Sequence, residues 1–391
     1  MSVEGYCTQR FKSLRDLFAA HLKSGQDLGA SICVSVHGET AVDLWGGYTT
    51  PARTTPWTKD TITPVFSISK TITALATFLL IDRGHLHPED PVSKYWPAFN
   101  TPDKQGVKVK HFLAHTAGLP SWDPPISVSE LFDIPTATQK LVAQEPWWEP
   151  GTASGYHLIS QGLLLGELIQ RVSGKSLQEF VKEEIALPLN ADFHLGLDEN
   201  EWTRLADMKP PQGSPMSADT FKNLPAESVQ LALRALRGCP IQASHSSTPE
   251  FRRSGIGSVA GLSNARGFNR ILELVTHRGS INGVQFLKPS TIDLIFESQA
   301  SGLDLVIGVP LNMGMGFGLS SGVGRIPWMP EGKVCFWGGL GGSIAVMDLE
   351  RGVTVTYAMN RMEEGTLGNS NSMDYVRAVY EVLEPRVYSS L

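Results

Sequence analysis

The 391-residue sequence predicts an α/β (α+β) fold in which segments from both chain termini build one antiparallel sheet flanked by helices. Near the start, the apolar stretches 31–36 and 40–45 flank His37-Gly38-Glu39, a pattern typical of a β-hairpin. Strand character returns in three late stretches: 334–337, 343–348 and 353–359. Between about residues 85 and 250, helical patterns alternate with loops rich in proline, glycine and tryptophan, which predicts a mostly helical lobe.

Amphipathic helices accompany the predicted strands. The apolar residues of the first helix recur at helical spacing: Phe11, Leu14, Leu17, Phe18 and Leu22. A second helix is predicted over 69–83 and is closed by Gly84, and a last one over 373–383. Because such helices bury an apolar stripe, we expect them to cover the faces of the sheet.

The alternation of elements predicts two lobes that form one catalytic unit. Residues 1–84 and 255–391 are expected to form the sheet lobe. Residues 85–254 are expected to form the helical lobe, with an irregular proline-rich flap at about 205–250. A binding site is expected in the crevice between the lobes.

Composition excludes several classes of partner. With 41% hydrophobic residues, 18% charged residues and a net charge of -6, the chain has the profile of an ordinary globular protein. It has no cluster of lysine and arginine, which argues against nucleic acid. Its apolar runs are too short to span a bilayer, and residues 1–10 lack the apolar core of a secretory signal, so no membrane partner is expected. Oligomeric state is not predicted.

Cysteine and histidine positions do not indicate a metal site. The four cysteines are scattered along the chain: Cys7, Cys33, Cys239 and Cys335. The absence of a C-x-x-C pair and of an N-x-S/T sequon favours an intracellular, cytoplasmic location. His111 and His115 have the spacing of a helical metal pair, but a structural role is favoured for both. No metal and no cofactor are predicted.

The tetrad Ser67-Ile68-Ser69-Lys70 stands at the start of the apolar run 71–81. Residues three apart on a helix share a face, so the Lys70 nitrogen can lie beside the Ser67 oxygen. A serine hydroxyl becomes a good nucleophile when a neighbouring base takes its proton. Lysine can be that base if burial lowers its pKa, and the apolar surroundings can supply the burial.

A structural interpretation of the tetrad competes with the catalytic one. A serine near a helix N-terminus is most often a cap, and Lys70 would then be a solvated first-turn residue. A lysine at that end of a helix opposes the macrodipole, however, and its neighbours are apolar. The tetrad alone leaves both interpretations open.

Three more segments carry chemistry: His111 to Pro120, Pro150 to Gly166 and Phe336 to Ser343. With Val42-Asp43-Leu44-Trp45-Gly46-Gly47 and the Ser67 tetrad, they occur in the order typical of a known group. From Gly29 to Met362 the chain resembles the serine β-lactamase and penicillin-binding-protein superfamily, specifically its family VIII carboxylesterase and transesterase branch. The resemblance implies a β-lactamase/transpeptidase-like fold.

The resemblance also implies a catalytic set. Ser67 corresponds to the acyl-accepting nucleophile, Lys70 to its base, and Tyr156 to a tyrosine that faces the pair from the helical lobe. Next to a lysine ammonium, the phenolate form of Tyr156 is expected to be more accessible, so that the two groups relay protons. The backbone N–H groups of Ser67 and Leu340 correspond to the oxyanion hole, and Gly339 lets the strand approach closely.

Two departures from the superfamily pattern bear on the substrate. Trp337 stands where lactamases and peptidases carry the lysine that grips a substrate carboxylate. The tyrosine triplet reads Tyr156-His157-Leu158 and lacks its polar third residue. Both changes favour a less polar ester over a penicillin-like carboxylate. The residues expected to line the substrate pocket are Trp337, Gly338, Gly339, Leu158 and Trp148.

The leading hypothesis is a serine ester hydrolase that acts through a covalent acyl-enzyme on a small, partly apolar carboxyl ester. The alternative is an acyltransferase or transesterase of secondary metabolism, in which an alcohol or amine acceptor replaces water. A β-lactamase, a D-amino-acid peptidase and a non-catalytic binding or sensor protein are less favoured. The last of these predicts damage to the catalytic set, yet Ser67, Lys70 and Tyr156 are all present.

Overall fold

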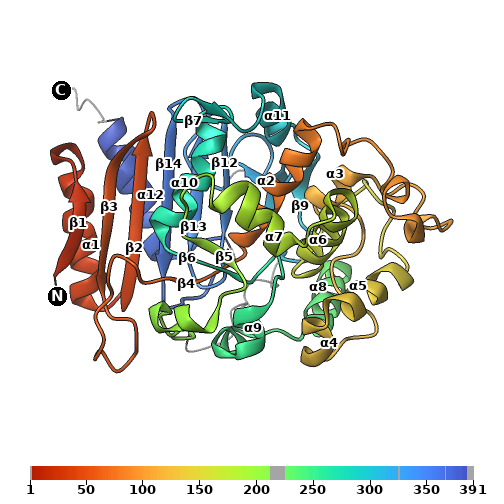
Figure 1. Ribbon diagram of the computed structural model, residues 1–391, viewed down its shortest axis with the longest axis horizontal. Helices are drawn as coiled ribbons and strands as arrows, with labels where there is room; N and C mark the ends of the chain where they lie inside the picture. Colours follow the sequence, from red (N-terminus) through yellow and green to blue (C-terminus); the bar gives the residue numbers. More distant parts are fainter. Residues whose placement is uncertain (1, 212–224, 325, 366, 385–391) are drawn as a thin grey trace.

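The central feature of the computed structural model is a nine-stranded antiparallel sheet (Figure 1). The structure describes residues 2–211, 225–324, 326–365 and 367–384. Strand order is β1-β3-β2-β14-β13-β12-β11-β10-β9, so the strands from the two ends of the chain meet where β2 pairs with β14. That pairing runs from Ala30 opposite Met359 to Val36 opposite Val353. The predicted fold class is confirmed.

The strands are short outside the centre of the sheet. The first strands are β1 (Val3–Cys7), β2 (Gly29–Val36), β3 (Glu39–Gly47), β4 (Thr63–Phe66), β5 (Phe193–Leu195) and β6 (Gly261–Ser263). A small hairpin consists of β7 (Ser280–Ile281) and β8 (Val284–Gln285). The last strands are β9 (Ala300–Leu303), β10 (Pro310–Met313), β11 (Gly318–Leu319), β12 (Val334–Gly338), β13 (Ile344–Asp348) and β14 (Val353–Met359).

Helices occupy both faces of the sheet and most of the middle of the chain. The first are α1 (Lys12–Ser24), α2 (Ser69–Asp82), α3 (Val109–Leu113), α4 (Val128–Phe132), α5 (Ile134–Ala143) and α6 (Ser160–Ser173). The others are α7 (Leu177–Val181), α8 (Ala226–Gly238), α9 (Pro249–Arg253), α10 (Ala265–Thr276), α11 (Pro289–Asp293) and α12 (Ser370–Leu383). Within the described ranges, no helix combines the length and apolar character needed to cross a membrane.

The two faces of the sheet are covered by different helices. On one face, Thr356 of β14 donates a hydrogen bond to the carbonyl of Ala265 at the start of α10. Its neighbour Tyr357 points to the other face, where its ring packs 4.9 Å from that of Tyr375 in α12. Side chains alternate along a strand, so α10 and α12 lie on opposite faces. Helices α3–α6 and α8 gather at the end of the molecule away from β1 (Figure 1).

A buried carboxylate ties the N-terminal and C-terminal parts together. Asp27 precedes β2 and accepts hydrogen bonds from the hydroxyls of Tyr357 and Tyr375. Asn371, in the first turn of α12, donates to the same carboxylate at 3.1 Å. Burial raises the pKa of Asp27, against the opposing effect of these donors. The donors compensate the burial of a polar group that would otherwise destabilise the fold.

A second, three-stranded sheet ends directly before the serine tetrad. Its order is β4-β6-β5, and β4 leads directly into α2. All of α2 from Ser69 to Leu80 is buried, because apolar residues lie all around the helix and its polar side chains form hydrogen bonds within the fold. The second sheet and the buried helix therefore fix the backbone on both sides of Ser67.

Several elements were not predicted from the sequence. The mostly exposed strand β1 pairs with β3 at the sheet edge, and the short strands β9–β11 extend the opposite edge. Edge and very short strands bury too little apolar surface to show a period-2 pattern. In the expected flap at about 205–250, residues 212–224 lie outside the described residues, and α8 follows them. The division into lobes of residues 1–84 with 255–391 and 85–254 stays a prediction.

Candidate active site

Ser67 lies in the turn between β4 and α2 and is half-buried between fully buried neighbours. The preceding residue, Phe66, has a φ of 45°, in the left-handed region that bulky residues rarely adopt. Its ring is held in the core, 6.2 Å from the ring of Phe251 in α9. Strained backbone of this kind persists only where the surrounding structure imposes it, and it is common at functional sites.

Ser69 holds this turn in place. Its hydroxyl donates to the carbonyl of Phe66 at 2.5 Å and accepts from the N–H of Gly261 in β6 at 2.8 Å. Ser69 is fully buried and does not cap α2. The two serines of the tetrad therefore differ, since Ser69 bonds the two strands together while the Ser67 hydroxyl faces Lys70 and Tyr156.

Lys70 is buried, with 1% of its surface exposed, and contacts three oxygens. Its Nζ lies 3.2 Å from Oγ of Ser67, 2.8 Å from the carbonyl oxygen of Leu158 and 2.9 Å from that of Ser258. Burial lowers the pKa of Lys70 well below its usual range. A neutral amine has two N–H donors, which the two carbonyls satisfy, so its lone pair is left to accept the Ser67 proton.

Tyr156 completes the group around the Ser67 oxygen. Its hydroxyl donates to Oγ of Ser67 at 2.7 Å, and Nζ of Lys70 lies 4.7 Å from the centre of its ring. Burial raises the pKa of Tyr156, with smaller opposing effects from hydrogen bonding. The expectation of an accessible phenolate beside a lysine ammonium is therefore wrong, because burial of both groups favours the neutral phenol and the neutral amine.

A buried carboxylate fixes the backbone of Tyr156, and the sequence did not indicate it. Asp304 follows β9 and is 1% exposed. Its Oδ1 accepts from the N–H of Tyr156 at 3.0 Å, and its Oδ2 accepts from the hydroxyl of Ser154 at 2.8 Å. Oδ1 also accepts from the N–H groups of Val306 and Ile307, each at 3.0 Å. A loop aspartate far along the chain has no sequence signal that links it to Tyr156.

Aromatic and histidine rings enclose Tyr156. The ring of Trp337 in β12 lies 5.3 Å from it, and that of His115 lies 4.9 Å from it and stacks on Trp337 at 5.8 Å. Burial holds the pKa of His115 well below its usual range, so the ring is neutral. Its Nδ1 accepts from the N–H of His157, which places the remaining proton on Nε2.

The two histidines considered as a metal pair separate in the structure. His111 accepts from the N–H of Lys108 at 3.2 Å and packs near Gly151, whereas His115 contacts Tyr156. Among the described residues, no group of three or more histidine, cysteine or acidic side chains could hold a metal ion.

The glycines that follow Trp337 have close backbone neighbours. A Cβ on Gly338 would lie 2.7 Å from Cα of Leu367, and one on Gly339 would lie 2.4 Å from the carbonyl oxygen of Val65. Real Cβ atoms do not come so close to backbone atoms, so both positions require glycine. The end of β12 thus lies directly against the end of β4. Within the described residues, neither the N–H of Leu340 nor that of Ser67 donates a hydrogen bond.

The expected pocket residues have different surroundings. Trp148 packs its ring on Gly155, where a Cβ would lie 2.4 Å away, and meets the ring of His157 edge-on. Leu158 is half-buried and contributes its carbonyl oxygen to Lys70. The indole N–H of Trp337 is buried, and hydrogen bonding from Trp337 opposes the rise in the pKa of Tyr156.

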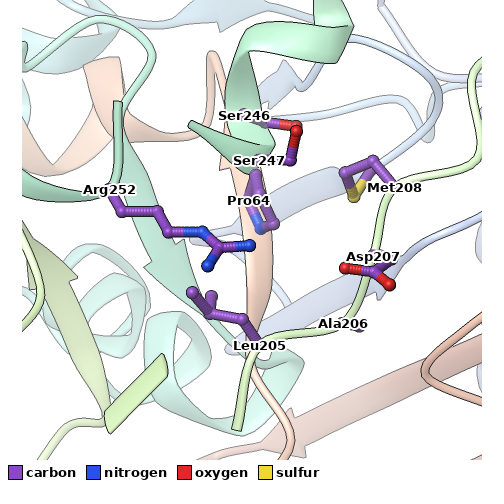
Figure 2. Close-up of a pocket in the computed structure, with 8 residues that line it drawn as sticks. All are labelled: Pro64, Leu205, Ala206, Asp207, Met208, Ser246, Ser247 and Arg252. Carbon is purple, nitrogen blue, oxygen red and sulfur yellow. The ribbon is translucent and has the colours of Figure 1, made fainter. Parts of the chain in front are cut away.

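A small cavity lies beside β4, between residues 205–208 and residues of the segment 246–252 (Figure 2). It is lined by eight residues: Pro64, Leu205, Ala206, Asp207, Met208, Ser246, Ser247 and Arg252. In Figure 2 the side chain of Arg252 extends toward Pro64 and Leu205. The cavity volume of about 10 Å³ is enough for one water molecule and too small for an organic substrate.

Comparison with known proteins gives likenesses over almost the whole chain. A family model described as Beta-lactamase matches residues 14–378. "Esterase/beta-lactamase LipL" of Mycobacterium tuberculosis is 31% identical over 372 residues, which cover 92% of this chain and 83% of LipL. The crystal structure of a family VIII carboxylesterase has a TM-score of 0.88 at 29% identity and covers 98% of this chain and 100% of its own.

A second solved structure is also similar over almost the whole chain. The structure of EstA from Arthrobacter nitroguajacolicus Rue61a has a TM-score of 0.83 at 28% identity and covers 98% of this chain and 99% of its own. The family resemblance predicted from the sequence is confirmed. The family model, LipL and the two solved structures all match nearly the whole chain. The chain is a member of the Beta-lactamase family.

Proposed function

We propose that this protein is a serine ester hydrolase that cleaves a small, partly apolar carboxyl ester through an acyl-enzyme on Ser67. One observation carries the proposal: Oγ of Ser67 lies 3.2 Å from Nζ of a buried Lys70 and 2.7 Å from the hydroxyl of Tyr156. The esterase description of LipL and the family VIII carboxylesterase structure support ester chemistry.

In the acylation step, neutral Lys70 takes the hydroxyl proton of Ser67 while Oγ forms a bond to the ester carbonyl carbon. The carbonyl oxygen becomes an oxyanion, which the N–H groups of Ser67 and Leu340 stabilise. When the intermediate collapses, the bond to the alkoxy oxygen breaks. Tyr156 gives its proton to the departing alkoxide and recovers one from the Lys70 ammonium, so both groups end neutral.

Deacylation repeats these transfers with water in place of the serine hydroxyl. Lys70 takes a proton from water while the water oxygen forms a bond to the acyl carbon. The bond between the acyl carbon and Oγ of Ser67 then breaks. The Lys70 ammonium returns this proton to the Ser67 oxygen, and the carboxylic acid leaves, so Lys70 is neutral again. An acyltransferase would differ only in the nucleophile, which would be an alcohol or an amine.

The surroundings of the catalytic group favour an uncharged substrate. Trp337 places an indole where, by the family resemblance, a cation would hold a carboxylate, and its ring packs against that of Tyr156. An ionised group bound against these aromatic rings would lose hydration without gaining an ion pair. A neutral ester loses far less, which is why an ester is proposed over a penicillin-like acid.

The test is the intact mass of the protein after brief exposure to short esters. A mass increase equal to the acyl group, mapped to the Ser67 peptide, is expected for the wild type. Adding an alcohol or amine acceptor distinguishes hydrolysis from transfer, because a transferase converts the acceptor into a new ester or amide. Turnover without any acyl adduct, including under rapid quenching, would contradict the acyl-enzyme.

Replacing Tyr156 with phenylalanine removes one oxygen and keeps the ring contacts with His115 and Trp337. Tyr156→Phe is expected to lower kcat by about 10²-fold or more, since the departing alkoxide loses its positioned proton donor. The measurement is turnover of an alkyl ester, with thermal unfolding as a check on the fold. Near-normal kcat in a folded variant would remove Tyr156 from the mechanism.

Asp304 is expected to act on the reaction through Tyr156. Asp304→Ala leaves the N–H groups of Tyr156, Val306 and Ile307 without their acceptor and is expected to cost about 2–4 kcal/mol of stability. In the folded fraction, kcat is expected to fall by up to about 10²-fold because Tyr156 moves. Asp304→Asn keeps one acceptor oxygen and should restore most of kcat. Equal kcat in both variants would make Asp304 purely structural.

A further inference from the structure

The sheet holds the indole of Trp337 beside Tyr156. Trp337 lies opposite Ala345 of β13, and Ala345 lies opposite Thr356 of β14. Paired residues on neighbouring strands share a face of the sheet, so Trp337 projects from the face on which Thr356 meets α10. There the indole is 1% exposed, and its ring lies 5.3 Å from that of Tyr156. The paired strands therefore fix the side from which the indole approaches Tyr156.

His115 fixes the plane of the indole. Its ring stacks on that of Trp337 at 5.8 Å, with an angle of 20° between the planes, and contacts the ring of Tyr156 at 4.9 Å. The His115 ring is itself held, because its Nδ1 accepts from the N–H of His157 at 3.1 Å. The three packed rings leave the indole little freedom to rotate.

The indole N–H of Trp337 is a buried donor that makes no hydrogen bond of ordinary length in the described part of the chain. Tyr156 is the group on which it acts, since hydrogen bonding from Trp337 opposes the rise in the pKa of Tyr156. A buried donor with so distant a partner costs stability in the resting protein. The contact becomes favourable when the oxygen that it faces becomes a stronger acceptor.

The Tyr156 oxygen becomes a stronger acceptor when the substrate alcohol leaves. In the proposed acylation, the O–H bond of Tyr156 breaks and its proton goes to the departing alkoxide, which leaves a phenolate until the Lys70 ammonium supplies a proton. At that moment Oγ of Ser67 carries the acyl group and has no proton to donate. Burial disfavours the phenolate, so a neutral donor beside its oxygen has a large effect.

The geometry points to the indole N–H of Trp337 as the donor that stabilises the Tyr156 oxygen after it has given up its proton. The indole acts through Tyr156 and keeps its own proton, so its effect is confined to substrates whose alcohol needs a proton to leave. A contact that is long at rest and tightens in the transition state stabilises that state selectively. This inference rests on the proposed ester hydrolysis.

Two acetate esters with different leaving groups test this role. Ethyl acetate and p-nitrophenyl acetate yield the same acetyl-enzyme, and kcat/KM reports on its formation. Ethoxide needs a proton to leave, whereas p-nitrophenolate is stable without one. Trp337→Phe removes the N–H and is expected to lower kcat/KM for ethyl acetate by roughly tenfold or more, the effect of one hydrogen bond to a charged oxygen. For p-nitrophenyl acetate the expected loss is less than about threefold, because no proton is transferred to the leaving group.

An isosteric replacement and a matched control sharpen the result. Benzothienylalanine, incorporated at position 337 only, keeps the bicyclic shape of the indole and has sulfur in place of the N–H. It should lower the ratio of ethyl to p-nitrophenyl acetate as Trp337→Phe does, and it keeps the test valid should the smaller phenylalanine ring disturb the packing.

Trp57→Phe is the control, because Trp57 is also buried and its indole nitrogen also lacks a hydrogen bond of ordinary length in the described ranges. The backbone N–H of Trp57 bonds to Gly47 of β3, which β2, β14 and β13 separate from β12. The ester ratio of this variant should equal that of the wild type, and thermal unfolding checks the fold of every variant.

A double variant separates action through Tyr156 from direct contact with the substrate. In a Tyr156→Phe background, Trp337→Phe is expected to change the ester ratio no further, because the oxygen that the indole serves is absent. The same factor of loss in both backgrounds would show that the indole acts on the substrate itself, and would overturn the inference.

The remaining outcomes distinguish this inference from the proposed function. If acetyl-enzyme forms on Ser67 but the benzothienylalanine protein keeps the wild-type ester ratio, the role of the N–H is refuted and the proposed function stands. The absence of any acyl adduct on Ser67 in the wild type would overturn both proposals.

Discussion

Ser67→Ala is expected to abolish ester turnover, with a loss in kcat of roughly 10⁴-fold or more. The substitution removes the only oxygen that lies within hydrogen-bond distance of both Lys70 and Tyr156 among the described residues. The acyl adduct in the intact mass should vanish with it. The fold should be intact, because Ser67 is half-buried and its hydroxyl bonds no strand. The measurement is turnover of a p-nitrophenyl ester together with the mass after ester exposure.

Ser69→Ala is the matched neighbour for this experiment. The hydroxyl of Ser69 bonds Phe66 and Gly261, so its loss should lower the melting temperature. The folded fraction should still form an acyl-enzyme on Ser67. An adduct that persists in Ser67→Ala and disappears in Ser69→Ala would assign the nucleophile to the other serine.

Replacement of Lys70 is expected to have the next largest effect. Lys70→Met keeps most of the buried volume and should lower kcat by about 10²- to 10⁴-fold, as expected for loss of a general base. The direction in which kcat/KM changes with pH is a second test of the role of Lys70. Because burial lowers the pKa of Lys70, the neutral amine forms at lower pH than for an exposed lysine. Wild-type kcat/KM should rise as pH increases through that lowered pKa, and Lys70→Met should lose this limb.

Lys70→Arg separates a base from a fixed positive charge. An arginine side chain stays protonated at any working pH, so it can supply charge but cannot accept the Ser67 proton. We expect this variant to be as inactive as Lys70→Met. Turnover close to that of the wild type in Lys70→Arg would show that position 70 acts through its charge.

The sequence was a good guide to the large elements and a poor one to the small ones. Helix α2 and strands β12–β14 are long and apolar, so their patterns predicted them within a residue or two at each end. Strand β1 is mostly exposed and does not alternate apolar with polar residues, and β11 has two residues. Their pairing depends on neighbours far along the chain, which no local pattern records.

For the candidate site, the sequence predicted which residues come together but not their charge states. Ser67, Lys70 and Tyr156 were found by motif and order, and the structure places them within contact of one another. The expectation that the phenolate of Tyr156 is accessible was wrong, because it took a neighbouring lysine ammonium as the main influence on the pKa of Tyr156. The pKa of each group depends on burial, which is a property of the packed fold.

What the sequence by itself determined is the family and the residue types of the candidate site, because those follow from motifs in a set order. Only the tertiary structure decided that two carbonyl oxygens, of Leu158 and Ser258, satisfy the Lys70 amine. It alone brought Asp304 to the backbone of Tyr156 and Leu367 onto Gly338. Carbonyls and other backbone atoms exist at every residue, so their roles depend on three-dimensional position and leave no mark in the sequence.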